Sequence, residues 1–336
     1  MSTSKLMDIN TVQAVNLALE DAMTENESVI LFGEDVADPE GGGVLGVTRG
    51  LSTKFGNSRV RSTPIAEQAI IGAAIGASLD GMRPVAEIML MNFTTIAMDM
   101  IVNHAAKLRY MSGGQTHVPI VIRTMTGAGV GSGGQHTDML EAWFAHTAGM
   151  KVVAPSSPAE AYGLFLSCVD DDDPCLFIEN LPTYFKKGPP PERGKRIPLS
   201  KANIMQEGTD VSVISYGRMI GEVLTAAEEL KKDGISVEVV DLRTISPMDT
   251  ETVLASVSKT GRAVIVHEAV RSYGVGAEVS SRITEALFNE LKAPVQRVAA
   301  GDHPVPVSRP LEQAHIPSPE QIESAVRTTL SYKRKS

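Results

Sequence analysis

The stretch PIAEQAIIGAAIGASLDGMRP, residues Pro64–Pro84, is the most informative guide to the fold of this chain. It reads as a helix made almost wholly of Ala, Ile, Gly and Leu, and a β-rich run follows it directly. One carboxylate, Glu67, stands at the head of the helix, and apolar surroundings tend to raise the pKa of such a group, which can then bind a ring nitrogen. Small residues that let another helix approach closely recur along it: Gly72, Ala73, Gly76 and Ala77. The pattern predicts a carboxylate at a tightly packed seam. The alternative is an ordinary buried helix with a solvated Glu in its first turn, where the helix dipole favours negative charge.

Length and composition limit the possible classes of protein. The 336 residues suffice for two domains, and 43% hydrophobic with 21% charged residues indicates a folded protein. A net charge of -9 argues against a general nucleic-acid binder. The sequence has no apolar run long enough for a membrane span, and its first ten residues do not resemble a signal peptide. With two cysteines, Cys168 and Cys175, no disulfide framework is available, so we expect a cytoplasmic protein.

The first half of the chain alternates β-rich runs with helical patterns. Five runs read as buried strands: VILFG (29–33), PVAEIML (84–90), PIVIRT (119–124), KVVAP (151–155) and CLFIE (175–179). Four segments read as helices: 12–23, 66–79, 94–111 and 158–169. Near-continuous apolar strands are typical of a parallel sheet covered on both faces. The alternation therefore predicts an α/β fold with a doubly wound, mainly parallel sheet.

A proline-rich segment separates this region from a second one. It contains KKGPPPERGKRIP, whose consecutive prolines favour an extended chain. Beyond it, strand and helix patterns alternate again, which predicts a smaller α/β unit with its own core. We therefore expect a first domain over 1–185, a linker over 186–208 and a second domain over 209–330.

A glycine-rich segment, GAGVGSGGQH, follows the expected strand PIVIRT. Gly129, Gly131 and Gly134 satisfy G-x-G-x-x-G, so an NAD-dependent oxidoreductase is one hypothesis, but the acidic residue expected about twenty positions later is missing. A loop that lets the backbone approach a ligand fits better. It leads to His136, which is either a proton-transfer group or a surface histidine without function.

Phe93 follows directly after the expected strand that ends EIML. The ends of parallel strands are where open α/β proteins bind ligands, so Phe93 could stack on a flat heterocycle, although a core position is the commoner fate of Phe. The sequence has no P-loop, no G-x-S-x-G and no HExxH. It also lacks the Gly-Asp-Gly stretch with following asparagines that would hold magnesium diphosphate, so another chain would have to hold the phosphates of a diphosphate cofactor.

Several motifs together resemble one family. The run from GGGVLGVTRG to EIML, then NHAAKLRYMSGGQ, the QH loop, AHTAGMKVVAPSSP, DLRTISPMD, VHEAVRSYGVGAE and HIPSPEQI are similar to the beta subunits of thiamine-diphosphate-dependent 2-oxoacid dehydrogenases. The pyruvate, branched-chain and acetoin dehydrogenase beta subunits share these motifs, and the resemblance covers nearly the whole chain.

The resemblance implies a transketolase-like pyrimidine-binding domain followed by a transketolase C-terminal domain. It also implies a heterotetramer of two alpha and two beta chains, with thiamine diphosphate at each alpha–beta interface and magnesium held by the alpha chain. The activity it implies is decarboxylation of a 2-oxoacid, with pyruvate favoured, and acyl transfer to the lipoyl group of an acyltransferase core.

The resemblance assigns roles to four residues. Glu67 matches the glutamate that bonds the aminopyrimidine nitrogen and promotes the imino tautomer needed to activate the thiazolium. Phe93 matches the aromatic that stacks on the pyrimidine, and Ile65 matches a position whose backbone faces the same ring. His136 matches the active-site histidine near thiazolium and substrate.

Some family members bind a structural potassium ion, largely through main-chain oxygens. The matching positions here are Ile120, Cys168, Val169, Asp171 and Asp173. The acidic run DDDDP supplies hard oxygen donors, and a solvated acidic turn at a helix end explains it equally well.

The chain departs from the family at one point. Where the QH loop commonly continues with Ser-Gln, this chain has Thr137 and Asp138. Asp138 adds negative charge where an anionic 2-oxoacid would enter, which keeps neutral acetoin as the alternative substrate. Two rival hypotheses are the NAD-dependent oxidoreductase and a non-catalytic scaffold that uses the small-residue helix only for assembly.

Overall fold

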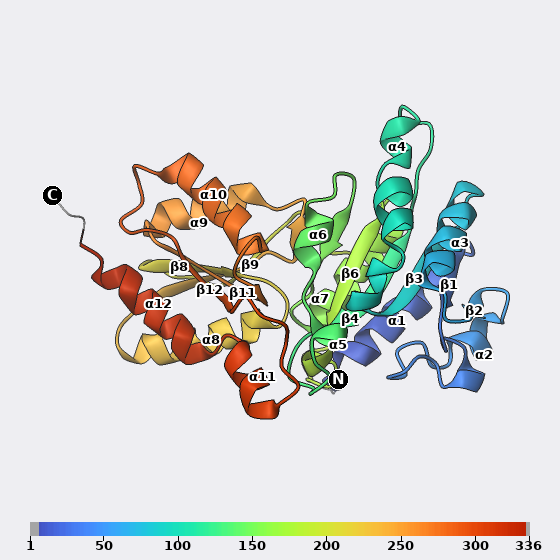
Figure 1. The fold of residues 1–336 in the computed structure, drawn as a ribbon, viewed down its shortest axis with the longest axis horizontal. Coiled ribbons are helices and arrows are strands. Elements are labelled where there is room, and N and C mark those ends of the chain that lie inside the picture. Colours follow the sequence, from blue (N-terminus) through green and yellow to red (C-terminus); the bar gives the residue numbers. More distant parts are fainter. Residues whose placement is uncertain (1–6, 334–336) are drawn as a thin grey trace, which may run out of the picture. The chain divides into compact units, whose positions relative to one another are not determined.

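The computed structural model describes residues 7–333, which form two compact units (Figure 1). The first unit comprises the described residues up to Thr126 together with Trp143–Leu199. The second comprises Gly127–Ala142 and the described residues from Ser200 onward. The glycine-rich segment therefore packs with the second unit, although by sequence it lies inside the range 1–185 expected for the first domain.

The first unit is built on a parallel sheet. Its hydrogen-bonded strands include the order β5-β6-β4-β3-β1-β2. The bounds are β1 Val29–Gly33, β2 Val60–Ser62, β3 Arg83–Leu90, β4 Val121–Thr126, β5 Lys151–Val153 and β6 Cys175–Asn180. Nearly every residue of β1, β3, β4 and β6 is buried, which explains why these strands read as continuous apolar runs.

The helices of the first unit are α1 Thr11–Glu25, α2 Leu51–Phe55, α3 Glu67–Leu79, α4 Leu108–Met111 and α7 Pro158–Asp170, with α6 Glu141–Ala145 at the boundary between units. Short 3-10 turns cover Asp38–Glu40, Met91–Thr95 and Leu181–Thr183. Local signals start the long helices: Asn10 and Gln13 form a capping box at α1, and Ser157 caps α7 before Pro158.

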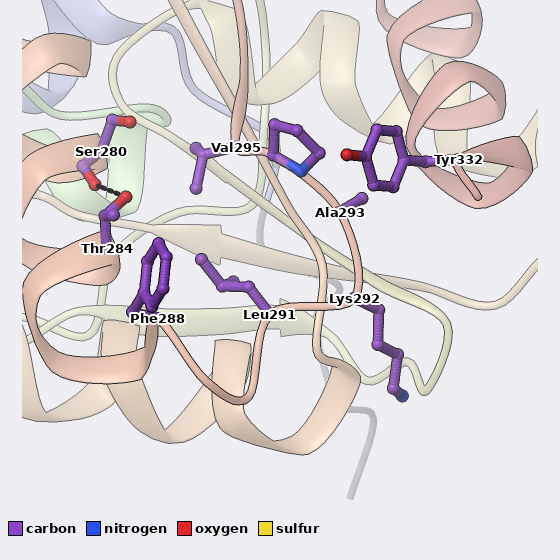
Figure 2. Close-up of a pocket in the computed structure, with 9 residues that line it drawn as sticks. Ser280, Thr284, Phe288, Leu291, Lys292, Ala293, Val295 and Tyr332 are labelled. Atoms are coloured by element: carbon purple, nitrogen blue, oxygen red, sulfur yellow. Dashed lines mark hydrogen bonds between the residues drawn. The ribbon is translucent and has the colours of Figure 1, made fainter. Parts of the chain in front are cut away.

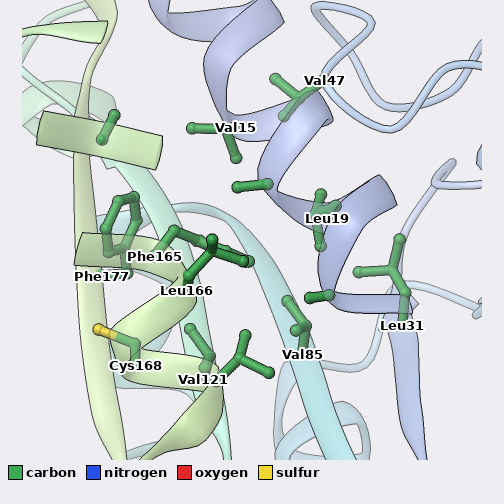
Figure 3. Close-up of a cluster of buried hydrophobic side chains, with 14 of the residues drawn as sticks. Val15, Leu19, Leu31, Val47, Val85, Val121, Phe165, Leu166, Cys168 and Phe177 are labelled. Carbon is green, nitrogen blue, oxygen red and sulfur yellow. The ribbon is translucent and has the colours of Figure 1, made fainter. Parts of the chain in front are cut away.

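The main core of the first unit lies where α1 and α7 pack on the sheet (Figure 3). Val15 and Leu19 of α1 meet Phe165 and Leu166 of α7 above strand residues such as Val85. Phe165 also contacts Phe177 edge to face, with 5.1 Å between ring centroids. This core supports the strands whose ends carry the candidate site.

The single helix expected over 94–111 is wrong. The structure has the 3-10 turn Met91–Thr95, a π-helical segment Met100–Ala105 and the short α4. The π segment is marked by the bond from Ala106 N to Ile101 O, five residues back, at 3.0 Å. An inserted residue of this kind leaves the apolar residues spaced much as in an ordinary helix, so periodicity does not reveal it.

The second unit holds a five-stranded sheet in the order β12-β11-β8-β9-β7, parallel except for β7. The strands are β7 Asn203–Gln206, β8 Val211–Ser215, β9 Val237–Asp241, β11 Ala263–Val270 and β12 Gln296–Ala300, and β10 covers Thr244–Ser246. The helices are α5 Gly134–Thr137, α8 Met219–Lys232, α9 Thr250–Thr260, α10 Val275–Leu287, α11 Arg309–His315 and α12 Pro319–Ser331.

The core of this unit joins α8 and α12 to β8, β9 and β11. The mainly parallel α/β architecture predicted for the chain is confirmed in both sheets. The stretch 186–208, expected as a linker, contains the strand β7, which pairs with β9 in the second sheet. Within residues 7–333, no helix is both long and apolar enough to cross a bilayer.

Candidate functional site

Three chain segments leave neighbouring parallel strands of the first unit at the same edge of the sheet. Glu34 follows β1, the segment with Ile65 and Glu67 follows β2, and Phe93 follows β3. Because these strands are parallel and adjacent, their carboxyl ends meet at one edge, where open α/β proteins bind ligands. The structure therefore brings together three of the residues singled out by the sequence and adds Glu34.

Glu67 is the first residue of α3 and is 6% exposed. The residue before it, Ala66, has no side chain that could cap the helix, so the first backbone N–H groups of α3 receive no side-chain acceptor from this residue. Within the part of the chain that the structure describes, no hydrogen bond or ion pair to the Glu67 carboxylate is present. The Glu67 carboxylate is thus held at this edge with its oxygens uncommitted to other described residues.

Ile65 and Phe93 flank this carboxylate in different ways. Ile65 is 82% exposed, so its side chain is not part of the core. Phe93 lies in the 3-10 turn after β3, is partly buried and packs against the main core cluster. Phe93 thus combines a core contact with a position at the carboxyl edge of the sheet.

Glu34 is a further carboxylate at this edge that the sequence analysis did not single out. Burial raises the pKa of Glu34, and the charges of Glu67 and Asp35 raise it further. Glu34 and Glu67 follow β1 and β2, which are paired parallel strands, so both carboxylates lie at the same edge. The signal was present in the sequence, because Glu34 stands directly after the buried run VILFG, much as Phe93 comes shortly after EIML.

His136 belongs to the second unit. It is part of the single-turn helix α5, where its N–H donates to Gly133 O at 3.0 Å and Thr137 Oγ1 donates to the same oxygen at 2.8 Å. The preceding loop has positive φ at Gly127, Gly129, Gly131 and Gly133, which only glycine adopts easily. A dinucleotide fingerprint needs a full helix whose N-terminus faces the phosphates, and α5 has only 4 residues, so the NAD hypothesis gains no support.

A buried polar cluster lies further along the same segment. Tyr216 Oη donates to Glu141 Oε1 at 2.6 Å, and its ring stacks on that of His267 at 6.4 Å. Burial lowers the pKa of His267 to about 4. The ring leaves no room around it, because a Cβ at Gly276 would come within 2.6 Å of His267 Nε2. These contacts hold the His267 ring in the interior of the second unit.

The Glu141 carboxyl makes stability depend on pH. Burial raises its pKa to about 7, with the Tyr216 hydroxyl opposing and the Glu268 charge adding to the rise. Between about pH 4.5 and 7 the Glu141 carboxyl therefore keeps its proton in the folded chain and loses it in the unfolded chain. The free energy of unfolding contributed by Glu141 accordingly falls as pH rises through that window. We expect Glu141→Gln, which keeps the Tyr216 hydrogen bond, to be more stable than the parent at pH 8 by roughly 3 kcal/mol and nearly equal to it at pH 4.5. Thermal unfolding at both pH values checks this, with the surface variant Glu229→Gln as control; an identical difference at both pH values would contradict it.

The five positions matched to a potassium site gather at the opposite edge of the first sheet. Ile120 and Asp173 precede β4 and β6, and Cys168, Val169 and Asp171 end α7. Their oxygens already have donors. Arg83 Nη1 donates to Val169 O at 2.9 Å and Asp171 O at 3.0 Å, and Cys175 N donates to Ile120 O at 2.9 Å.

Side-chain cations also neutralise the carboxylates of this set. Lys151 Nζ is 2.5 Å from Asp171 Oδ2 and 3.5 Å from Asp173 Oδ2, and Arg109 Nη1 is 2.7 Å from Asp173 Oδ1. In the described part of the chain, no group of three or more His, Cys, Asp or Glu is arranged to hold a metal ion. The chain thus supplies positive charge of its own at these positions, and a potassium ion bound here stays a prediction.

The second unit also has a shallow hollow with a volume of about 330 Å³ (Figure 2). It is lined by residues of α10 and the following segment, among them Phe288 and Leu291, and by Tyr332 after α12. None of the site residues expected from the sequence lines it.

Comparisons with known proteins match this architecture. The family model for the transketolase pyrimidine binding domain matches residues 7–185, and that for the transketolase C-terminal domain matches residues 200–322. A split-gene transketolase, an inactive beta4 tetramer, has a TM-score of 0.77 at 23% identity, covering 98% of this chain and 100% of that one. A transketolase from Pichia stipitis has a TM-score of 0.71 at 16% identity, covering 98% of this chain and 47% of that one. These structures confirm the transketolase-like fold.

Curated relatives are more similar in sequence. The beta subunit of the acetoin:2,6-dichlorophenolindophenol oxidoreductase of Cupriavidus necator is 45% identical over 325 residues, 94% of this chain and 96% of that protein. The pyruvate dehydrogenase E1 component subunit beta of Staphylococcus epidermidis is 43% identical over 329 residues, 97% of this chain and 100% of that protein. The Bacillus subtilis subunit of the same name is 43% identical over 328 residues, again 97% and 100%. With both domain models and these full-length matches, this chain belongs to the family of transketolase-like pyruvate and acetoin dehydrogenase beta subunits.

Proposed function

We propose that this chain is the beta subunit of a thiamine-diphosphate-dependent 2-oxoacid dehydrogenase, acting with an alpha subunit on pyruvate. The observation that carries the proposal is Glu67, 6% exposed at the carboxyl edge of the sheet. Within the described residues its carboxylate has no hydrogen-bond partner. Relatives at 43% identity over their whole length are pyruvate dehydrogenase E1 beta subunits, which supports the same reaction here.

The residues at this edge fit the pyrimidine half of the cofactor. Glu67 supplies a protonatable carboxyl for a ring nitrogen, the exposed Ile65 supplies accessible backbone, and Phe93 supplies an aromatic face. When bound, thiamine diphosphate supplies the electron sink for decarboxylation. The protein's part is to orient the pyrimidine ring and to hold a proton at the Glu67 carboxyl. Glu34, whose pKa burial raises, lies at the same edge of the sheet.

The diphosphate and its magnesium ion are assigned to the alpha subunit. The sequence carries no magnesium–diphosphate motif, and the described residues hold no cluster of metal-ligating side chains. His136 is proposed to act on substrate or on the incoming lipoyl group, as a proton-transfer group at the end of its loop.

An exposed apolar surface supports a partner subunit. Helix α3 is apolar on all sides, yet Ala73 and Gly76 are exposed and Leu79 is 52% exposed. A Cβ at Gly76 would meet nothing within 4 Å, so this face is open to another chain. A helix that is apolar all round is normally buried, and we propose that it is buried in a heterotetramer of two alpha and two beta chains that docks on a lipoyl acyltransferase core. Both cysteines are free thiols, which supports a cytoplasmic location.

Acetoin is the second candidate substrate. The relative at 45% identity is named for acetoin, and Asp138 adds a negative charge two residues after His136 that would disfavour an anionic 2-oxoacid.

A substrate panel tests the proposal. The chain is co-expressed with its alpha subunit, and the purified complex is assayed with thiamine diphosphate, magnesium and the dye 2,6-dichlorophenolindophenol as electron acceptor. We expect the highest kcat/KM with pyruvate among pyruvate, branched-chain 2-oxoacids and acetoin. Preference for acetoin would establish the second candidate, and cofactor-independent turnover would contradict both.

A further inference from the structure

The loop that carries His136 is held by two carboxylates from distant parts of the second unit. Ala128 N donates to Glu268 Oε1 at 2.6 Å, and Gly129 N donates to Glu312 Oε1 at 2.7 Å. Gly131 N is 3.1 Å from both Glu312 oxygens. Three peptide N–H groups within four residues thus converge on anions, in the manner of a backbone nest that binds phosphate. Here the anions are side chains of the same chain.

Both carboxylates are buried and come from regular elements. Glu268 lies on β11 and Glu312 on α11, and each is 3% exposed. Arg218 reinforces the first contact, because its Nη1 donates to Ala128 O at 2.6 Å while its Nε lies 3.8 Å from Glu268 Oε2. Hydrogen bonds to buried carboxylates are among the stronger ones, so these contacts restrain the loop more than turn geometry alone would.

The next part of the loop is fixed by packing. A Cβ at Gly133 would come within 2.7 Å of Val307 Cγ2, and one at Gly134 within 3.1 Å of Pro304 Cβ. The loop therefore runs against the segment that leads into α11, and it reaches His136 two residues later. Without such contacts a glycine-rich loop would sample many conformations, and His136 would have no fixed position.

We propose that Glu312, supported by Glu268, is a positioning residue that fixes the His136 loop for turnover; this rests on the role of His136 in the proposed function. Neither carboxylate contacts substrate in this scheme. Each acts through the backbone of residues 128–131, so its loss would displace His136 rather than remove a reacting group.

The test compares Glu312→Ala with Glu312→Gln in the assembled complex with its alpha subunit. Gly129 and Gly131 both donate to Glu312 Oε1, so a glutamine oxygen at that position retains these two bonds and loses only the second Gly131 contact, to Oε2, whereas alanine loses all three. We expect kcat to fall roughly 30- to 100-fold in Glu312→Ala and less than about 3-fold in Glu312→Gln, since displacement by about 1 Å can cost 100-fold. Thiamine diphosphate affinity is expected to stay within about 2-fold. Glu229→Ala, on the surface of α8, is the matched control and is expected to behave as the parent.

Two further measurements separate positioning from general damage. Hydrogen–deuterium exchange of the peptide spanning residues 127–136 is expected to be faster in Glu312→Ala and unchanged in Glu312→Gln. In a double-mutant cycle, Glu312→Ala is expected to cost little more once His136 is Ala, because both changes remove the same contribution. Independent, multiplying effects would overturn the positioning role, as would normal turnover of Glu312→Ala while His136→Ala is impaired. Normal turnover of His136→Ala would instead overturn the proposed role of His136 and, with it, this inference.

Discussion

Replacing Glu67 by Gln is expected to lower kcat of the assembled complex by at least about 100-fold. Glutamine has nearly the same size and can still donate a hydrogen bond to a ring nitrogen, but it cannot exchange a proton with it. Side chains that transfer protons contribute about 100- to 10,000-fold to turnover, so the loss should fall in that range. Turnover at saturating thiamine diphosphate, with pyruvate as substrate, measures the effect.

The same variant distinguishes proton control from cofactor binding. We expect calorimetric titration with thiamine diphosphate and magnesium to show only modest weakening, since Phe93 and the backbone at Ile65 remain. The rate of deuterium exchange at the thiazolium C–H should fall with kcat in Glu67→Gln, and should stay near the parent value in His136→Ala. Glu20→Gln, a carboxylate on α1 paired with Lys54 at 2.6 Å, is the control and should change neither quantity. Near-normal exchange in Glu67→Gln would exclude the role proposed for this residue.

The position of Glu67 could be predicted from the sequence because its signals are local. A carboxylate at the head of an apolar helix, followed by a buried β-rich run, predicted both α3 and the strand β3 after it. Helix periodicity likewise predicted α1 and α7 to within a few residues. These elements are regular, and their apolar spacing is fixed by the geometry of the backbone.

Features that depend on distant contacts were not predictable in the same way. The glycine-rich loop packs with the second unit because Glu268 and Glu312 accept its N–H groups, and these residues lie 140 or more positions further along the chain. The sequence also gave no reason to expect that Arg83 and Lys151 would take the oxygens matched to a potassium site. Glu34 is different: its place after β1 was visible, and only its interaction with Glu67 required the structure.

Charged residues inside the strands of the first sheet, like Glu34, could have been noticed in the sequence before the structure was known. The apolar runs PVAEIML, PIVIRT and CLFIE each contain one charged residue: Glu87, Arg123 and Glu179. Because β3, β4 and β6 are neighbours, the arginine lies between the two acids. Buried charges of this kind are rarely tolerated without partners.

The partners of Arg123 satisfy most of its guanidinium. Its Nη1 pairs with Glu87 Oε2, its Nη2 donates to Glu179 Oε2 at 3.0 Å, and its Nε lies 2.5 Å from Glu179 Oε1. Tyr184 Oη donates to Glu179 Oε2 at 2.6 Å. Burial alone would lower the pKa of Arg123, but the two carboxylates outweigh it and raise that pKa, so the side chain stays charged. Burial raises the pKa of Glu87, and the Arg123 charge opposes this rise.

Arg123→Met is therefore expected to destabilise the first unit by about 3–5 kcal/mol, the typical cost of leaving buried charges without a partner. For a unit of this size the melting temperature should fall by roughly 10 °C, measured by thermal unfolding of the assembled complex. Arg196→Met, at a surface arginine paired with Glu25 at 2.6 Å and Asp170 at 2.9 Å, should cost less than about 1 kcal/mol.

Two comparisons identify the uncompensated carboxylates as the cause. The triple variant Glu87→Gln/Arg123→Met/Glu179→Gln, which removes all three charges together, should recover much of the lost stability, because a buried ion pair contributes little beyond an uncharged replacement of similar shape. The loss in Arg123→Met should also shrink as pH falls toward 5, since Glu87, whose pKa is already raised, takes up a proton more easily without the guanidinium. If the triple variant were as unstable as Arg123→Met at every pH, lost packing around the arginine stem rather than unpaired charge would explain the effect.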